Sequence, residues 1–241
     1  MLDESARQSS SPEGQVLNAV PALPGDWPAT FVFLTEGGGC TSTAIGRKVV
    51  ITAAHCVRDR QDARVVVGNT GVALSCYHHP DYLRDISADY ALCLLDSSLP
   101  NLDSGFERIN SSRDIIRPPA RLLLLGYGCT TNQGQRDFGK LYQGFSTVEE
   151  NSAANLYIHT KGGAAGCFGD SGGGAYWIES EQEIKGKRLL VGITSKGDVS
   201  TNSWLSSTAA TSFFGWARSW AADRAVTICG VPGPEDNCRP G

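Results

Sequence analysis

The sequence predicts an all-β protein of two similar units, followed by one C-terminal α-helix. Its 241 residues include 28 glycines spread between short apolar runs, and glycine supplies the positive φ angles that tight turns need. Hydrophobic residues make up 41% of the chain and charged residues 19%, which is typical of a globular protein. The chain is long enough to bury a sizeable core in one large domain or two small ones.

Ten short apolar segments, separated by Gly, Asn and Asp, have the character of β-strands. Between the first five and the last five, the stretch 110–119 contains two prolines, which forbid helix and central strand alike. The chain is therefore expected to form two β units. The predicted strands are Thr30–Thr35, Lys48–Ala53, Arg64–Gly68, Val72–Tyr77, Tyr90–Leu95, Arg121–Leu125, Leu141–Val148, Leu156–Thr160, Gly174–Ile178 and Leu189–Thr194.

One segment near the C-terminus has a helical pattern instead. Its apolar residues recur at steps of three and four, which places them on one stripe of a helix docked on the body of the protein. Thr211 and Ser212 precede the stripe and can cap the helix. The stripe consists of Phe213, Trp216, Ala217, Trp220 and Ala221.

The eight cysteines are an even number, which indicates a set of disulfides and a secreted or periplasmic location. A zinc cage is the competing interpretation, but there is no Cys-x-x-Cys pair and the four histidines lack ligand spacing. Spacing alone leaves on the order of a hundred pairings open. Residues 1–15 lack the basic start and apolar core of a signal peptide, so either an export signal was removed upstream or Met1 was added for expression.

Charge and hydropathy exclude several partners. The net charge of −4 gives no electrostatic case for binding nucleic acid or anionic lipid. The longest apolar runs, such as Leu122–Leu125, fall far short of the about 20 residues of a membrane-spanning helix. No metal or cofactor motif is visible, and nothing in the composition demands a partner chain, so a monomer is expected.

The most informative motif is Cys167–Gly173, in which Ser171 stands among glycines. Such a turn can expose a serine hydroxyl and point backbone N–H groups at a developing oxyanion. A nucleophilic serine needs a base, and His55 follows a β-branched strand and precedes a cysteine that can anchor it. The other histidines, His78, His79 and His159, are expected to be surface imidazoles.

A base of this kind also needs a carboxylate that orients it. Asp89 stands at the start of the apolar run Tyr90–Leu95, where an unpaired carboxylate would cost free energy, whereas Asp81 and Asp85 are expected to be solvated. All four histidines precede Ser171. This order excludes an α/β-hydrolase, whose histidine follows its serine, unless another chain supplies the base.

With these motifs in place, the sequence resembles the chymotrypsin/trypsin family of serine peptidases. The resemblance spans about residues 16–225, and its two departures from the cysteine pattern of animal members resemble bacterial secreted members. It is carried by ITAAHC at 51–56, DYAL at 89–92, CFGDSGGG at 167–174, GITSKG at 192–197, VLNA at 16–19 and LPGDWP at 23–28. It implies two six-stranded antiparallel β-barrels packed together.

The resemblance also implies a role for each site residue. Ser171 would be the nucleophile, His55 the general base and then acid, and Asp89 the orienting carboxylate, in the chain order of chymotrypsin. The N–H groups of Gly169 and Ser171 would form the oxyanion hole. Substrate would be bound by Ala165, Gly166, Phe168, Ser195, Lys196 and Gly197, the last three as a strand edge that pairs with an extended peptide.

Asp170 has a separate implied role, which is to pair with the α-ammonium of Val16 after an activation cleavage. Removing one partner of such a buried pair costs about 3–5 kcal/mol. The family's usual activation site has Arg or Lys before the cut bond, whereas this chain has Gln15. Either an unusual protease matures the chain, or Val16 never becomes a free terminus.

The specificity pocket is expected to be uncharged. Trypsin-like members carry an acid six residues before the nucleophile, where this chain has Ala165. With Gly197 on a wall and Ala209 opposite, the pocket would accept a medium or large hydrophobic side chain. Cleavage after basic residues is the alternative, if Asp198 reaches the pocket.

The layout implied by the resemblance pairs Cys40 with Cys56, Cys76 with Cys93, Cys129 with Cys167, and Cys229 with Cys238. It divides the chain into an N-terminal extension or activation peptide (1–15), an N-terminal barrel (16–112), a linker (113–119), a C-terminal barrel (120–211), and a helix with a disulfide-closed tail (212–241). The expected protein is a secreted serine endopeptidase and zymogen that acts through an acyl-enzyme on polypeptides. The alternatives are a catalytically silent homologue acting as a binding module and a non-peptidase acyl hydrolase.

Overall fold

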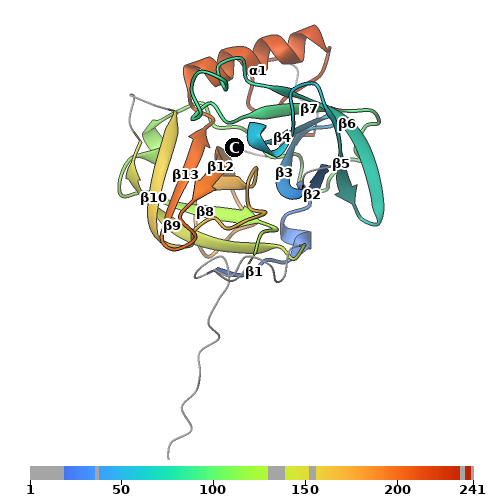
Figure 1. The fold of residues 1–241 in the computed structure, drawn as a ribbon. Helices are drawn as coiled ribbons and strands as arrows, with labels where there is room; N and C mark the ends of the chain where they lie inside the picture. The colour runs from blue at the N-terminus through green and yellow to red at the C-terminus, as the bar shows by residue number, and fades with distance from the viewer. Residues whose placement is uncertain (1–18, 36–37, 130–138, 152–155, 234–236, 240–241) are drawn as a thin grey trace, which may run out of the picture.

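The chain folds into two closed antiparallel β-barrels of six strands each and one C-terminal α-helix. In the computed structural model, shown in Figure 1, residues 19–35, 38–129, 139–151, 156–233 and 237–239 are described. The predicted fold class of two six-stranded barrels with a terminal helix is confirmed.

The N-terminal barrel closes in the order β2-β3-β4-β7-β6-β5, with β5 pairing back onto β2. Its strands alternate as the sequence requires, since Ala63 and Val65 are buried while Asp62 and Arg64 are exposed. The strands are β2 (Thr30–Thr35), β3 (Gly38–Gly46), β4 (Val49–Thr52), β5 (Asp62–Val67), β6 (Thr70–His78) and β7 (Ala91–Leu95).

The C-terminal barrel closes in the order β8-β9-β10-β13-β12-β11, because β8 pairs with both β9 and β11. A short turn of 3₁₀ helix, Asp114–Ile116, precedes it in the chain. The strands are β8 (Arg121–Gly126), β9 (Tyr142–Glu150), β10 (Tyr157–Gly163), β11 (Gly174–Ile178), β12 (Arg188–Gly197) and β13 (Asn202–Ser207).

All ten predicted strands overlap observed ones, but three observed strands were not predicted. The first is β1 (Val20–Pro21), which lies in the range expected for the N-terminal barrel yet pairs with β9 of the C-terminal barrel. The others are β3 and β13, in which serine and threonine side chains are buried beside a few apolar ones, namely Ala44, Ile45 and Leu205. Their polar sequences carry no hydrophobic alternation, so the pattern that reveals a strand is missing.

Helix α1 (Thr211–Asp223) packs on the N-terminal barrel with the predicted stripe, burying Phe213, Ala217, Trp220 and Ala221. The ring of Phe213 lies 4.5 Å from that of Tyr90. The predicted cap is wrong, because Ala210 occupies the N-cap position without a side-chain hydrogen bond and Thr211 is already helical. Within the described ranges, no helix has the length and apolar character needed to cross a membrane.

The expectation of a surface imidazole is wrong for His79, which is only 3% exposed. Its ring packs edge-on against Tyr90 and Trp216, at centroid distances of 5.7 and 5.0 Å. Burial lowers the pKa of His79, so the ring is held neutral and packs as an aromatic side chain between the barrel and α1.

Candidate active site

His55 stands where β4 ends and the chain turns into a single 3₁₀ helix, Ala54–Cys56. The disulfide Cys40–Cys56 fixes this turn to β3 of the same barrel. Ala54 and Cys56 are buried, whereas the His55 side chain is 37% exposed. The fold thus anchors both neighbours of His55 and leaves its imidazole accessible.

Asp89 precedes β7, and its side chain is only 3% exposed. Its Oδ1 accepts the backbone N–H of His55 at 2.9 Å, and its Oδ2 lies 2.7 Å from His55 Nδ1. Because an ionised carboxylate only accepts hydrogen bonds, the Nδ1 nitrogen carries the proton and Nε2 is left able to accept one. Ser195 of β12 donates a third hydrogen bond, from Oγ to Asp89 Oδ2 at 2.6 Å, so both barrels hold this carboxylate.

Ser171 lies on the loop before β11, and β3 of the other barrel holds that loop. Thr41 donates its backbone N–H to Ser171 O and its hydroxyl to Gly169 O, each at 2.8 Å. Gly172 has a φ of +80°, and an added Cβ would stand 2.0 Å from Thr52 Oγ1 and 2.9 Å from Ala53 N. The residue after Ser171 therefore touches the strand end that leads into His55, which requires glycine there.

Gly169, one of the two residues whose N–H groups are expected to form an oxyanion hole, lies in a tight turn, Cys167–Asp170, and Ser171 follows this turn directly. Asp170 N–H donates to Cys167 O at 3.0 Å, and Gly169 has a φ of +96°, which matches the third position of a type II turn. Among the hydrogen bonds between described residues, none uses the N–H group of Gly169 or Ser171.

The carboxylate of Asp170 points away from solvent into the C-terminal barrel. It accepts the N–H groups of Gly128 and Cys167 at 2.8 and 2.9 Å. Burial raises the pKa of Asp170 to about 7, although both hydrogen bonds lower it. A small cavity beside Asp170 is lined in part by Gly166 and Thr194. Val16, the partner expected for this carboxylate, lies outside the described residues.

The residues expected to form a specificity pocket are buried and uncharged. Ala165 is 1% exposed, and Gly166 N–H donates to Ser203 Oγ at 2.9 Å. The expected position of Ala209 is wrong, because the residue of β13 opposite Gly197 is Ser203. Ala209 lies beyond the far end of that strand, where Ser207 pairs with Gly192.

Asp198, considered as a charged pocket residue, is turned toward its own loop. Its carboxylate accepts the backbone N–H groups of Ser200, Thr201 and Asn202, and the side-chain amide of Asn202. Slight burial raises its pKa, but these hydrogen bonds outweigh it and lower the pKa to about 2. Asp198 therefore stabilises a turn as a carboxylate.

Of the remaining expected substrate residues, Lys196, Gly197 and the buried Ser195 lie along one stretch of β12. Along β12, pairing with β11 ends at Ile193, whereas pairing with β13 continues to Gly197. No described strand pairs with the edge of Ser195–Gly197 that faces away from β13. Lys196 is exposed, with its Nζ over the rings of Tyr157 and Trp204, and Phe168 is 69% exposed.

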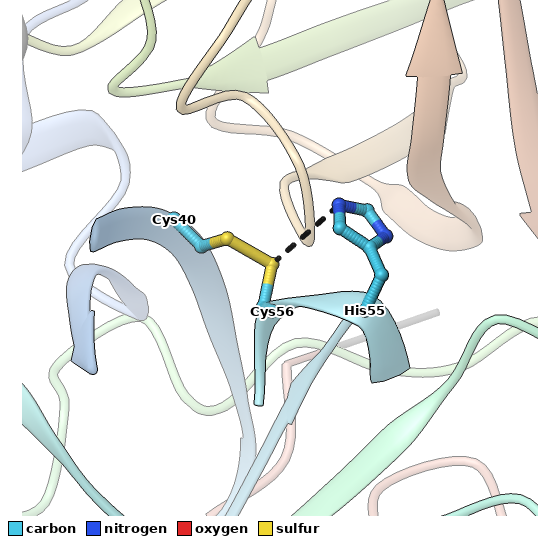
Figure 2. A group of neighbouring side chains, drawn as sticks. All are labelled: Cys40, His55 and Cys56. Carbon is cyan, nitrogen blue, oxygen red and sulfur yellow. Dashed lines mark hydrogen bonds between the residues drawn. A yellow bond between two sulfur atoms is a disulfide. The ribbon is translucent and has the colours of Figure 1, made fainter. Parts of the chain in front are cut away.

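The four disulfides are the pairs that the resemblance implies: Cys40–Cys56, Cys76–Cys93, Cys129–Cys167 and Cys229–Cys238. One cluster with metal-ligand atoms occurs among the described residues, formed by Cys40, His55 and Cys56 and drawn in Figure 2. The two sulfurs are bonded to each other, so neither is the thiolate that binds a metal. His55 Nε2 simply lies 4.0 Å from Cys56 Sγ.

Two site residues have no sequence signal that would have revealed them. Thr41 of β3 also accepts the N–H of Tyr127 through its hydroxyl, at 2.9 Å, so one threonine ties two segments of the C-terminal barrel to the N-terminal one. The second residue, Tyr157 of β10, lies next to the serine that binds Asp89, with its hydroxyl 3.3 Å from Ser195 Oγ. Neither residue belongs to a motif, because each contributes through distant contacts alone.

Comparisons with known proteins agree with this geometry. The family model described as Trypsin matches residues 16–216. The chain is 25% identical over 226 residues to atrial natriuretic peptide-converting enzyme of Mus musculus and 24% identical over 229 residues to that of Homo sapiens, covering 82% of this chain each time. It is 26% identical over 200 residues to trypsin of Saccharopolyspora erythraea, covering 72% of this chain and 82% of that protein.

The chain spans about a fifth of the length of the two mammalian relatives, 20% for mouse and 21% for human. The family match, in contrast, covers most of this chain and includes the segments of His55, Asp89 and Ser171. Together with the two closed barrels and the carboxylate-bound imidazole between them, this match shows that the chain belongs to the chymotrypsin/trypsin-like family of serine peptidases.

Proposed function

We propose that the chain is a secreted serine endopeptidase that hydrolyses polypeptides through an acyl-enzyme. The observation that carries this proposal is the buried Asp89 carboxylate, which orients His55 from one barrel and is itself held by Ser195 from the other. This arrangement fixes the tautomer in which Nε2 can accept a proton. The four disulfides support an oxidising compartment.

In the proposed reaction, Ser171 Oγ attacks the scissile carbonyl carbon while His55 Nε2 takes the hydroxyl proton. The negative carbonyl oxygen binds the N–H groups of Gly169 and Ser171. As the C–N bond breaks, His55 returns the proton to the leaving amine, and an ester to Ser171 remains. Water then hydrolyses the ester, with His55 again acting as base and then acid. No cofactor takes part in these steps.

The expected substrate is an extended polypeptide. The open edge of Ser195–Gly197 offers backbone hydrogen bonds to an added strand, and the mammalian relatives are named for converting a peptide. Ala165, Gly166 and Ser203 form an uncharged pocket wall. We expect cleavage after medium or large hydrophobic residues, measured by profiling a peptide library, and a dominant preference for Arg or Lys would contradict this assignment.

The proposal includes activation by cleavage after Gln15. The buried Asp170 carboxylate, whose pKa is raised to about 7, would be stabilised as an anion by the new α-ammonium of Val16. The expected result is that a chain beginning at Val16 digests casein much faster than the chain beginning at Met1. Equal activity of the two chains, with the intact N-terminus verified by sequencing, would overturn the activation step.

A fluorophosphonate probe separates the proposed function from its alternatives. We expect stoichiometric labelling of Ser171 in the chain beginning at Val16, together with cleavage of casein. Absence of labelling in both chains would favour a silent homologue that acts as a binding module. Labelling without cleavage of any protein would favour a non-peptidase acyl hydrolase.

A further inference from the structure

We propose that the Cys129–Cys167 disulfide positions the oxyanion donor Gly169 N–H, so that breaking the bridge lowers kcat far more than it weakens substrate binding. This inference rests on the proposed peptidase function. It assigns Cys129 a positioning role.

The bridge connects two segments far apart in the chain. Cys129 follows β8, and Cys167 begins the turn Cys167–Asp170. Beside the bridge, the backbone N–H of Cys129 donates to Phe168 O at 2.8 Å. Cys129 thus contacts the turn in two ways, through its disulfide and through its backbone N–H.

The hydrogen bond from Cys129 N–H to Phe168 O restrains the peptide unit that carries the proposed oxyanion donor. Phe168 C=O and Gly169 N–H belong to the same peptide, and in a trans peptide these two groups point in opposite directions. A carbonyl fixed toward Cys129 therefore fixes the N–H toward the opposite side. Because Gly169 has no Cβ, little else in the local backbone would resist rotation of this peptide.

Side-chain packing of Phe168 does little to restrain rotation of the Phe168–Gly169 peptide. Phe168 is 69% exposed, so its side chain contributes little burial to hold the turn in place. Cys129, in contrast, is 2% exposed, and the neighbouring Gly128 N–H binds Asp170 Oδ1 at the other end of the turn. The segment 128–129 is thus a buried support of the turn, and the disulfide links this segment covalently to the turn.

The tail disulfide Cys229–Cys238 provides a matched control. It joins the end of the chain to itself over a sequence separation of 9, and Cys229 donates its N–H to Ile45 O at 2.7 Å and accepts the N–H of Ile109 at 2.9 Å. Its removal is expected to change stability alone.

The test compares Cys129→Ser/Cys167→Ser with Cys229→Ser/Cys238→Ser, both in the chain beginning at Val16. Losing one oxyanion donor lowers kcat by about 10²–10³-fold, and a donor that is only misaligned should cost less, about 10- to 100-fold. We expect this fall in kcat for the first variant with KM changed less than about threefold, and no such fall for the tail variant.

Two further measurements distinguish a misplaced Gly169 N–H from a general loss of structure or substrate binding. A peptide aldehyde, whose adduct with Ser171 places an oxygen in the hole, should lose affinity by the same factor as kcat. Binding of the same peptide sequence without the aldehyde, measured in the Ser171→Ala background, should stay unchanged. If the variant does not fold, partial reduction and alkylation of the folded wild type, with the opened bridge mapped by mass, provides the same comparison.

An unchanged kcat after opening the Cys129–Cys167 bridge would overturn the inference. So would a loss confined to KM and to peptide binding, which would place the bridge in substrate binding. If the wild type with all bridges intact is neither labelled by fluorophosphonate nor cleaves peptides, the proposed function fails instead.

Discussion

Replacing Ser171 by alanine is expected to lower kcat for a peptide substrate by about 10⁶-fold, the cost of losing the serine in a comparable peptidase. The variant cannot form the proposed acyl-enzyme, while the strand edge and the pocket proposed to bind substrate remain. KM should therefore change much less than kcat. Replacing the exposed Ser219 on α1 provides the matched control, with activity equal to that of wild type.

A second variant, Asp89→Asn, tests the carboxylate that orients His55. An asparagine amide can donate to His55 Nδ1, which would move the imidazole proton to Nε2 and remove the base. The expected loss is about 10⁴-fold in kcat at neutral pH, the size of the loss that this change causes in a comparable serine peptidase. Initial rates on a chromogenic peptide, normalised by fluorophosphonate titration, measure both variants. Retention of more than about one part in a hundred of wild-type activity by Ser171→Ala would contradict the assigned nucleophile.

The largest effect on stability is expected at the buried pair of Arg188 and Glu107, both 0% exposed. Arg188 Nη2 and Nε bind the two carboxylate oxygens, and the guanidinium lies 3.7 Å from the centroid of the Trp27 ring. Glu107→Leu leaves the arginine charge buried without its counter-ion. We expect a loss of about 3–5 kcal/mol in the free energy of unfolding.

Replacing both partners should cost far less than replacing one. In Glu107→Leu/Arg188→Met neither charge of this pair is left without its counter-ion, and such apolar substitutions are often neutral or stabilising. The exposed pair Arg121–Glu181, with side chains 51% and 40% exposed, is the matched control, and Glu181→Leu should cost less than about 1 kcal/mol. Denaturant unfolding measures all three. Equal losses for Glu107→Leu and Glu181→Leu would contradict the role of the buried pair.

Much of the fold was predictable because its strands follow simple rules. The segments Thr30–Thr35 and Gly174–Ile178 were predicted with their observed bounds, since apolar runs between turn residues reveal strands directly. Strand β3 was not predicted, because Thr41, Ser42 and Thr43 are fully buried polar residues. They are stable there because tertiary partners accept their hydrogen bonds, as Gly169 O does for Thr41. No local pattern can reveal a partner 128 residues away.

The candidate site was likewise predictable only in part. His55, Asp89 and Ser171 stand in short motifs whose residue types follow from the chemistry of acyl transfer, so the sequence alone singled them out. The wrong positions were those that depend on register and side-chain direction: Ala209 lies past the end of β13, and Asp198 binds its own loop. A change of register along a strand changes which side chain faces the pocket, and only the strand pairing fixes that register.

By itself, then, the sequence determined the architecture, the family and the chemical groups of the site, because apolar spacing and reactive residue types are local properties. Only the tertiary structure decided that Ser195 and His55 share one carboxylate, that His79 is a core residue, and that Cys129 grips the turn of Gly169. Each of these depends on directed contacts between distant segments. Hydrogen bonds and burial are set by three-dimensional neighbours, which spacing along the chain does not encode.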